Sequence, residues 1–207
     1  MTTDQEAAST TAAVYRGAIE TLRTLLAEAT ASGDPEPTAM SLATSDGRGR
    51  VSSRIVLLKA LDERGLQFFT NYESCKGRQL AEHPGAALTF HWKTLREQVQ
   101  ARIEGRVTRL PAADSDAYFA TRPRQSQIGA WASLQSEPLA SRAVFDDRVA
   151  SFEQRFADLP VPRPPHWGGY LLVPDLIEFW YGARFRLHER VRHERRDGAW
   201  TTQLLYP

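Results

Sequence analysis

The sequence predicts an antiparallel β-barrel, mainly β in content, with helices packed at its periphery. Short runs rich in β-branched and aromatic residues recur from Ala39 to Val107 and again from Gly168 to Leu205, and turn residues separate them. Helical patterns interrupt these runs instead of alternating with them, which argues against a parallel sheet. The length of 207 residues, with 42% hydrophobic and 25% charged side chains, fits one globular domain.

The amino-terminal part predicts one helix after a disordered tail. Residues 1–13 are rich in Thr and Ala, and we expect them to be disordered. From Val14 to about Ala31 the apolar side chains recur at helical spacing, and the Ser32–Pro35 segment ends the pattern. A single folded domain should therefore span residues 14–207 and begin with a helix packed on the sheet.

Most of the sheet is expected in the first half of the chain. Turn residues at Ser45–Gly47 and Asp62–Gly65 join the first three strands into a meander. A short helix at Lys76–His83 ends before Pro84. The expected strands are Ala39–Ala43, Val51–Lys59, Leu66–Thr70, Ala86–Trp92 and Glu97–Val107.

The second half is expected to begin with helices and to return to strands. Helical patterns cover Pro111–Thr121 and Pro138–Leu159, and we interpret the Arg122–Trp131 segment between them as a loop that follows a helix end at Pro123. The remaining expected strands are Gly168–Val173, Leu176–Tyr181, Phe185–Arg192 and Trp200–Leu205.

Composition and missing motifs exclude several classes of function. Lys and Arg number 26 against 25 Asp and Glu, so the net charge gives no general attraction to nucleic acid or membrane. One cysteine, Cys75, fits a reducing compartment. The sequence has no dinucleotide or phosphate-loop fingerprint and no metal-binding histidine pair. We therefore expect a cytoplasmic protein without metal, nucleic acid or membrane partners.

Arg186, His188 and Arg190 form the first candidate cluster. On a strand, alternation would place all three on one face, where they could converge on an anion. Because Arg192 and further arginines follow, a solvated charged strand face explains the pattern equally well. The pattern alone leaves both interpretations open.

Two further clusters are cationic. Arg54 and Lys59 bracket an apolar strand, and in isolation they are more typical of snorkelling cations than of a shared site. Arg122, Arg124 and Ser126 follow the helix end, a suitable place for a phosphate pocket. An ordinary polar helix end would present the same residues.

Together and in order, these segments resemble the pyridoxamine 5'-phosphate oxidase family. The resemblance runs from Pro37 to the C-terminus. It implies the FMN-binding split β-barrel and a homodimer with two FMN molecules at the subunit interface. The matching motifs are Arg54–Lys59, Phe69-Thr70 with Ser74 and Lys76, Arg96–Gln98, Ser126–Trp131, Gln135-Ser136, Trp167–Gly169, Glu178–Trp180 and Arg186–His188.

The resemblance also implies active sites shared between two chains. Gln135 and Ser136 are expected to reach the FMN that the other subunit holds. The expected FMN-binding residues are Arg54, Ile55, Val56, Leu57, Leu58, Lys59, Phe69, Thr70, Lys76, Gln98, Gln135, Ser136, Trp180 and Arg190. The expected substrate-binding residues are Lys59, Tyr118, Arg122, Ser126, Arg186 and His188, the last two being the expected catalytic pair.

By this resemblance, the reaction is oxidation of pyridoxamine or pyridoxine 5'-phosphate to pyridoxal 5'-phosphate, a step of vitamin B6 metabolism. FMN takes a hydride from the C4' carbon, and O2 reoxidises the flavin and yields hydrogen peroxide; the amine substrate also releases ammonia. Arg186 and His188 are then expected to orient the ring and stabilise charge, not to act as strong acid or base. The phosphate groups of flavin and substrate explain the cations.

Several positions depart from the family pattern. Cys75 stands where many relatives carry Arg, so the grip on the flavin phosphate is expected to rest on Lys76. Tyr181 replaces a common Gln, and Leu204 departs from the usual C-terminal motif. The amino-terminal segment is short, so few residues there are candidates to close over a substrate.

Three other functions stay open. One is a phenazine-type flavin oxidase of secondary metabolism, although Lys59 and Arg122–Ser126 argue against it because a substrate without phosphate would not need them. The second is a noncatalytic FMN or pyridoxal-phosphate binding protein. The third is a nucleic-acid binder that uses Arg184–Arg196, which the near-neutral net charge disfavours.

Overall fold

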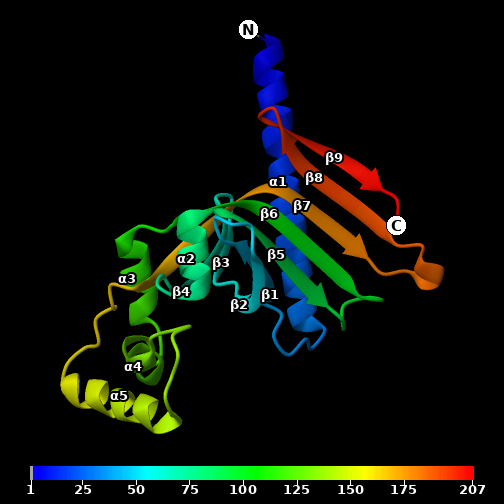
Figure 1. Ribbon diagram of the computed structural model, residues 1–207. Helices are drawn as coiled ribbons and strands as arrows, with labels where there is room; N and C mark the ends of the chain where they lie inside the picture. The colour runs from blue at the N-terminus through cyan, green and yellow to red at the C-terminus, as the bar shows by residue number, and fades with distance from the viewer. Residues whose placement is uncertain (1) are drawn as a thin grey trace.

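The computed structural model describes residues 2–207, and side chains from residue 11 onward. One antiparallel sheet dominates it, with helices at the periphery (Figure 1). The strands are β1 Ala39–Ser45, β2 Val51–Leu57, β3 Ala60–Asp62, β4 Gly65–Asn71, β5 Gly85–Trp92, β6 Val99–Arg109, β7 Trp167–Tyr181, β8 Glu189–Arg196 and β9 Ala199–Leu205. The helices are α1 Thr2–Ala31, α2 Cys75–Glu82, α3 Ala112–Ala120, α4 Arg124–Ala132 and α5 Arg142–Arg155.

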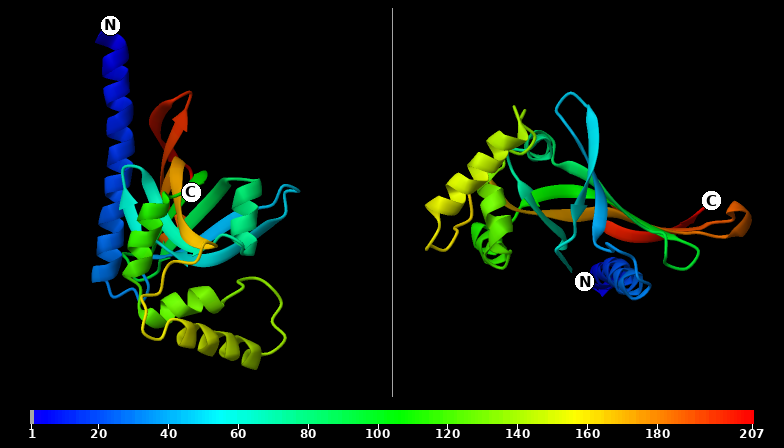
Figure 2. Two further views of the ribbon diagram at one scale, coloured as in Figure 1. Left: turned by 90° about the vertical axis from the view of Figure 1, so that its left-hand side faces the viewer. Right: turned by 90° about the horizontal axis from the view of Figure 1, so that it is seen from below.

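The sheet follows the order β2-β1-β5-β6-β7-β4-β3. Strand β2 at one end also contacts β4 near the other end, so the sheet curls into a barrel. The β8–β9 hairpin pairs with the second half of β7, beyond β4, and extends away from the barrel (Figures 1 and 2). The predicted class, antiparallel β with peripheral helices in a split barrel, is confirmed.

Helix α1 closes one side of the barrel. Its apolar side chains recur at helical spacing, and Ile19, Leu22 and Leu25 are buried in the main core with strand residues such as Phe90. Each such burial stabilises the fold by about 2 kcal/mol. Tyr15 of the same helix stacks on Trp200 at 4.9 Å.

Helices α3, α4 and α5 form a separate lobe at the start of β7 (Figure 2). Their apolar contacts form a second, smaller core cluster that includes Phe119, Ile128, Phe156 and Trp167, with the Phe119 ring 5.2 Å from the Trp167 ring. The lobe therefore anchors the first residue of β7 and brings helix ends over the barrel mouth.

Helix α1 differs from its predicted extent. It covers Thr2–Ala31 and does not start at Val14, so the described residues of the segment expected to be disordered are helical; Met1 lies outside the described residues. The segment before Val14 contains no Gly or Pro, and its four Ala residues favour the helix. None of the helices between residues 2 and 207 combines the length and apolarity needed to cross a membrane.

Strand β7 also differs, because one strand replaces the two predicted. Pro174 does not end it: Pro174 pairs with Gly105 of β6 at a β-bulge, where a residue without a donor N–H is tolerated. A Cβ on Gly105 would lie 2.0 Å from the carbonyl oxygen of Val173, so glycine is required there. The result is one continuous strand of 15 residues.

Candidate active site

A pocket of about 720 Å³ opens between the barrel and the lobe of helices α3 and α4. Most of the expected site residues line it. They are Ile55, Val56, Leu57, Lys59, Phe69, Thr70, Lys76, Tyr118, Arg122, Ser126 and Gln135. Leu58, by contrast, is buried in the main core. The polar members fall into two groups, one around Lys76 and one around Arg122.

Lys76 lies in the first turn of α2 and is only 8% exposed. Ser74 caps this helix by accepting a hydrogen bond from the Gly77 amide. The Lys76 ammonium donates to Ser74 Oγ at 3.1 Å and to Gln135 Oε1 at 3.0 Å. Burial and the nearby charge of Arg54 lower the pKa of Lys76 to about 8. A buried cation with only neutral acceptors is suited to binding an anion.

Arg54 lies on the inward face of β2 behind Lys76. Its guanidinium donates to Thr44 Oγ1 at 2.6 Å and Ser52 Oγ at 2.5 Å, and it also reaches the backbone of Leu42. Burial lowers its pKa. Among the side chains from residue 11 onward, no carboxylate forms an ion pair with Arg54 or Lys76.

Arg122, just beyond α3, carries the second group. Its guanidinium carbon lies 4.6 Å from the ring centre of Trp167, and the Tyr118 ring stacks on Phe69 at 4.0 Å beside it. Burial lowers the pKa of Arg122. Its Nη1 is buried and has no hydrogen-bond partner among the described residues. A buried donor without a partner destabilises the folded protein unless a ligand accepts its hydrogen bond.

The segment after α3 is the helix α4, so its prediction as a loop is wrong. Pro123 begins this helix, because proline is favoured where backbone N–H groups lack partners. Ser126 then lies in its first turn and faces the pocket. Arg124 turns away and donates to the carbonyl oxygens of Phe156 and Leu159 near the end of α5. It stabilises the lobe and does not line the pocket.

Gln135 and Ser136 lie beside Lys76 of their own chain. Gln135 Oε1 accepts from Lys76 and from Thr70 Oγ1, the latter at 3.3 Å. Ser136 Oγ accepts from the Cys75 amide at 3.1 Å. The expectation that the two residues reach the site from a partner subunit is therefore wrong. The chain after α4 folds back onto the amino end of α2 and completes this group without a second copy.

The other expected residues lie at the far end of β7. The Trp180 ring packs on His188 at 4.5 Å, and Trp180 pairs with Arg190 of β8. The Gln98 carbonyl accepts from the Gly182 amide at 2.9 Å, and Gln98 has a strained φ of 126°. Measured along β7, Trp180 is roughly 40 Å from Trp167 at the pocket. The expected site residues of one chain therefore fall into two separate groups, one at the pocket and one at the far end of β7.

Arg186 and His188 do not lie on a strand, so the predicted common face with Arg190 is wrong. Residues Arg184–Arg186 form a 3₁₀ turn, and Phe185 and Arg186 have φ of 57° and 63°, outside the extended region. Strand β8 begins only at Glu189. The Phe185 side chain is 91% exposed. Alternating side chains predict a strand only where one face of that strand packs on a core. Residues Arg184–Arg186 include no buried residue, so no core fixes a strand there.

Sequence reasoning missed two functional candidates. Trp167 is part of a matching motif, but only the fold shows that its ring supports Arg122. Gln79 was not noticed: its Oε1 accepts from Thr44 at 2.6 Å and from Ser52 at 2.9 Å, the two hydroxyls that hold Arg54. Nothing in the local sequence of α2 signals that role, because it depends on pairing across the barrel.

Comparisons with known proteins agree with this architecture. Residues 26–156 match the family model described as pyridoxamine 5'-phosphate oxidase, and residues 167–207 match the pyridoxine 5'-phosphate oxidase C-terminal dimerisation region. A Xanthomonas euvesicatoria pyridoxine/pyridoxamine 5'-phosphate oxidase is 54% identical over 94% of this chain and 98% of its own. The Myxococcus xanthus enzyme of the same name is 56% identical, covering 83% of this chain and 82% of its own.

Solved structures agree on the fold. PhzG from Burkholderia lata, in complex with tetrahydrophenazine-1-carboxylic acid, superposes with a TM-score of 0.86 at 34% identity, over 91% of this chain and 92% of its own. An FMN binding protein from Nostoc punctiforme, related to pyridoxamine 5'-phosphate oxidase, superposes with a TM-score of 0.67 at 19% identity, over 93% of this chain and 97% of its own. At this identity the likeness supports the fold alone. The matched dimerisation region supports a homodimer. The chain belongs to the pyridoxamine 5'-phosphate oxidase family.

Proposed function

We propose that the protein is an FMN-dependent oxidase that converts pyridoxamine or pyridoxine 5'-phosphate to pyridoxal 5'-phosphate, with O2 as acceptor and hydrogen peroxide as the second product. With the amine substrate, water is consumed and ammonia is released. The observation that carries the proposal is the unpaired, buried Nη1 of Arg122. It lies in a pocket that Lys59 and Ser126 also line, while Lys76 provides a second cationic group. Two anion-binding groups in one pocket suit two phosphorylated molecules, the flavin and the substrate.

The residues present fit FMN. Lys76, Thr70 and Gln135 would hold its phosphate, with Arg54 behind them, and the backbone of β2 would border the ring. Bound FMN supplies the redox chemistry, since it accepts a hydride from substrate and passes the electrons to O2. The chain supplies orientation: Lys59, Arg122 and Ser126 would grip the substrate phosphate and fix the distance to the reacting carbon.

The remaining residues would come from the partner subunit. Gln98, Trp180 and Arg190 would complete the flavin site, and Arg186 and His188 would lie over the substrate ring and stabilise its developing charge. The distance along β7 supports this division, because one chain does not bring its own two groups of site residues together. In a two-fold dimer each pocket meets the partner's strand end, which produces two equivalent sites.

A phenazine-type oxidase is the second candidate. Its support is the likeness to PhzG, which was solved with a carboxylate-bearing phenazine. Arg122 would then pair with a carboxylate, which it can do as readily as with a phosphate. A noncatalytic binding protein is the remaining alternative, and turnover separates it from both.

The direct test is to incubate the purified protein with FMN and pyridoxamine 5'-phosphate and to follow pyridoxal 5'-phosphate and hydrogen peroxide together. We expect both products in equal amounts, and little turnover of unphosphorylated pyridoxamine. Oxidation of a phenazine carboxylate without oxidation of the phosphorylated pyridine would favour the second candidate. FMN binding without turnover of either would identify a noncatalytic binding protein.

The lowered pKa of Lys76 predicts that FMN binding weakens in alkaline solution. Free protein loses the Lys76 proton near pH 8, whereas a bound phosphate favours the charged ammonium and raises its pKa. Affinity should therefore fall from pH 8 upward, by up to about tenfold per pH unit. Fluorescence titration of apoprotein with FMN from pH 7 to 9.5 measures this. Lys76→Met should bind more weakly at pH 7 and show no such slope; an equal slope in both proteins would rule out Lys76 as the source.

A further inference from the structure

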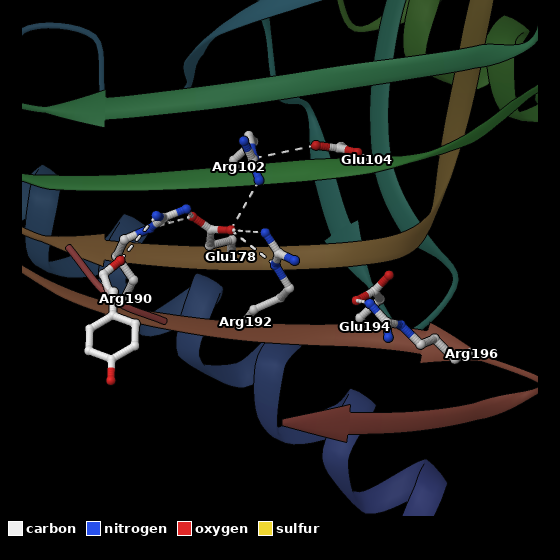
Figure 3. Close-up of polar contacts among 8 residues, drawn as sticks. Arg102, Glu104, Glu178, Arg190, Arg192, Glu194 and Arg196 are labelled. Atoms are coloured by element: carbon white, nitrogen blue, oxygen red, sulfur yellow. Dashed lines mark hydrogen bonds and ion pairs between the residues drawn. The ribbon is translucent and has the colours of Figure 1, made fainter. Parts of the chain in front are cut away.

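Glu178 lies at the centre of a charged cluster, on the face of β7 opposite to that of its core neighbours Ile177 and Phe179. Figure 3 shows the guanidinium groups of Arg102, Arg190 and Arg192 pointing toward its carboxylate from β6 and β8, the two strands beside β7. Oε2 accepts from Arg102 at 3.0 Å and from Arg192 at 3.1 Å, and Oε1 accepts from Arg190. The Glu178 side chain is only 4% exposed, so this face buries a carboxylate among cations.

The carboxylate is ionised. Burial alone would raise the pKa of Glu178, but the hydrogen bonds of Arg190 and Arg192 and the charge of Arg102 keep it below its ordinary value. A buried ion cluster is weak evidence for a gain in stability, because desolvation offsets the attraction. Such a cluster instead fixes the orientation of its guanidinium groups, because a planar guanidinium bound at two nitrogens has little freedom to turn.

Arg190 donates two hydrogen bonds to the Glu178 carboxylate and a third to the backbone. Its Nε and Nη2 donate to Glu178 Oε1 at 3.0 and 2.7 Å, and its Nη1 donates to the Tyr206 carbonyl at 3.2 Å. Of the five N–H bonds of a guanidinium, one on Nη1 and one on Nη2 are left for another group. Arg190 also pairs across the strands with Trp180, which packs on His188.

We infer that Glu178 is a positioning residue, which fixes the guanidinium of Arg190 so that its two remaining N–H bonds meet the flavin held by the partner subunit. The inference rests on the proposed function, in which Arg190 completes the flavin site. Glu178 acts through Arg190 and need not touch the flavin itself. Its effect on binding should therefore depend on Arg190 being present.

A double-mutant cycle tests this dependence. FMN affinity is measured by fluorescence titration of four apoproteins: wild type, Glu178→Gln, Arg190→Ala and the double variant. We expect Glu178→Gln to weaken FMN binding on the order of tenfold in the wild-type background and less than about twofold in the Arg190→Ala background. Glu104→Gln is the matched control, because Glu104 pairs with Arg102 at 3.3 Å but not with Arg190; its affinity should equal that of wild type.

Equal losses in both backgrounds, or no loss from Glu178→Gln, would overturn the inference. If Glu178→Gln does not fold, Glu178→Gln/Arg192→Gln replaces it, since that pair of changes keeps the net charge of the cluster. The same tenfold loss, dependent on Arg190, is expected. Wild-type protein that binds no FMN would overturn the proposed function together with this inference, whereas tight wild-type binding with additive losses overturns the inference alone.

Discussion

Replacing Arg122 with methionine should reduce kcat/KM for pyridoxamine 5'-phosphate about a hundredfold and leave FMN affinity unchanged. Methionine keeps the apolar contact with Trp167 but removes the buried charge that would pair with the substrate phosphate. Losing a charge-assisted hydrogen bond to a desolvated phosphate costs about 3 kcal/mol, which corresponds to about a hundredfold. Steady-state kinetics with the FMN-loaded dimer measure the loss, and flavin titration measures the cofactor.

The substrate without its phosphate provides the control. Wild type and Arg122→Met should oxidise pyridoxamine equally slowly, because this substrate carries no phosphate for Arg122 to bind. Arg122→Lys should be intermediate, since lysine keeps the charge but not the two-pronged geometry of the guanidinium. A similar loss with pyridoxamine and its phosphate would show that Arg122 shapes the pocket and does not bind the phosphate.

The elements that could be predicted from sequence were those with a strong hydrophobic period. The α1 stripe and the alternating strands β1 and β5 bury the residues that their patterns indicate, because tertiary packing and local preference agree there. Helix α4 was missed because Pro123 was interpreted as a helix end, although proline is equally favoured at a helix start. A single proline does not distinguish the two.

The layout of the site could be predicted only in part. Lys59, Lys76 and Arg122 were named from cation placement and resemblance, and they do line one pocket. The assignment of Gln135 and Ser136 to the partner was wrong because their position beside Lys76 depends on how the chain after α4 folds back onto α2. The separation of the expected site residues into two groups was also missed, because it depends on β7. If the strand ended at Pro174, two short strands would follow whose relative orientation the sequence does not fix. The bulge opposite Gly105 instead allows one continuous strand, which places Trp167 and Trp180 far apart. The sequence of one strand alone does not reveal such a β-bulge, because the bulge depends on how that strand pairs with its neighbour.

The proposed shared site predicts which inactive variants restore one another. Lys76→Ala damages the pocket half, and Arg186→Ala/His188→Ala damages the strand-end half. A mixed dimer of these two chains has one site with both defects and one site with neither. Each mixed dimer should therefore regain roughly half of wild-type dimer activity. Two different affinity tags and tandem purification isolate the mixed dimer before its oxidase activity is measured.

A second mixture gives the matched control and completes the measurement. Lys76→Ala and Gln135→Ala/Ser136→Ala damage the same half, so both sites of their mixed dimer carry a defect and activity should stay low. The proposed shared site predicts restoration in the first mixed dimer and none in the second. Restoration by Gln135→Ala/Ser136→Ala, with none by Arg186→Ala/His188→Ala, would contradict it and would assign Gln135 and Ser136 to the partner's site.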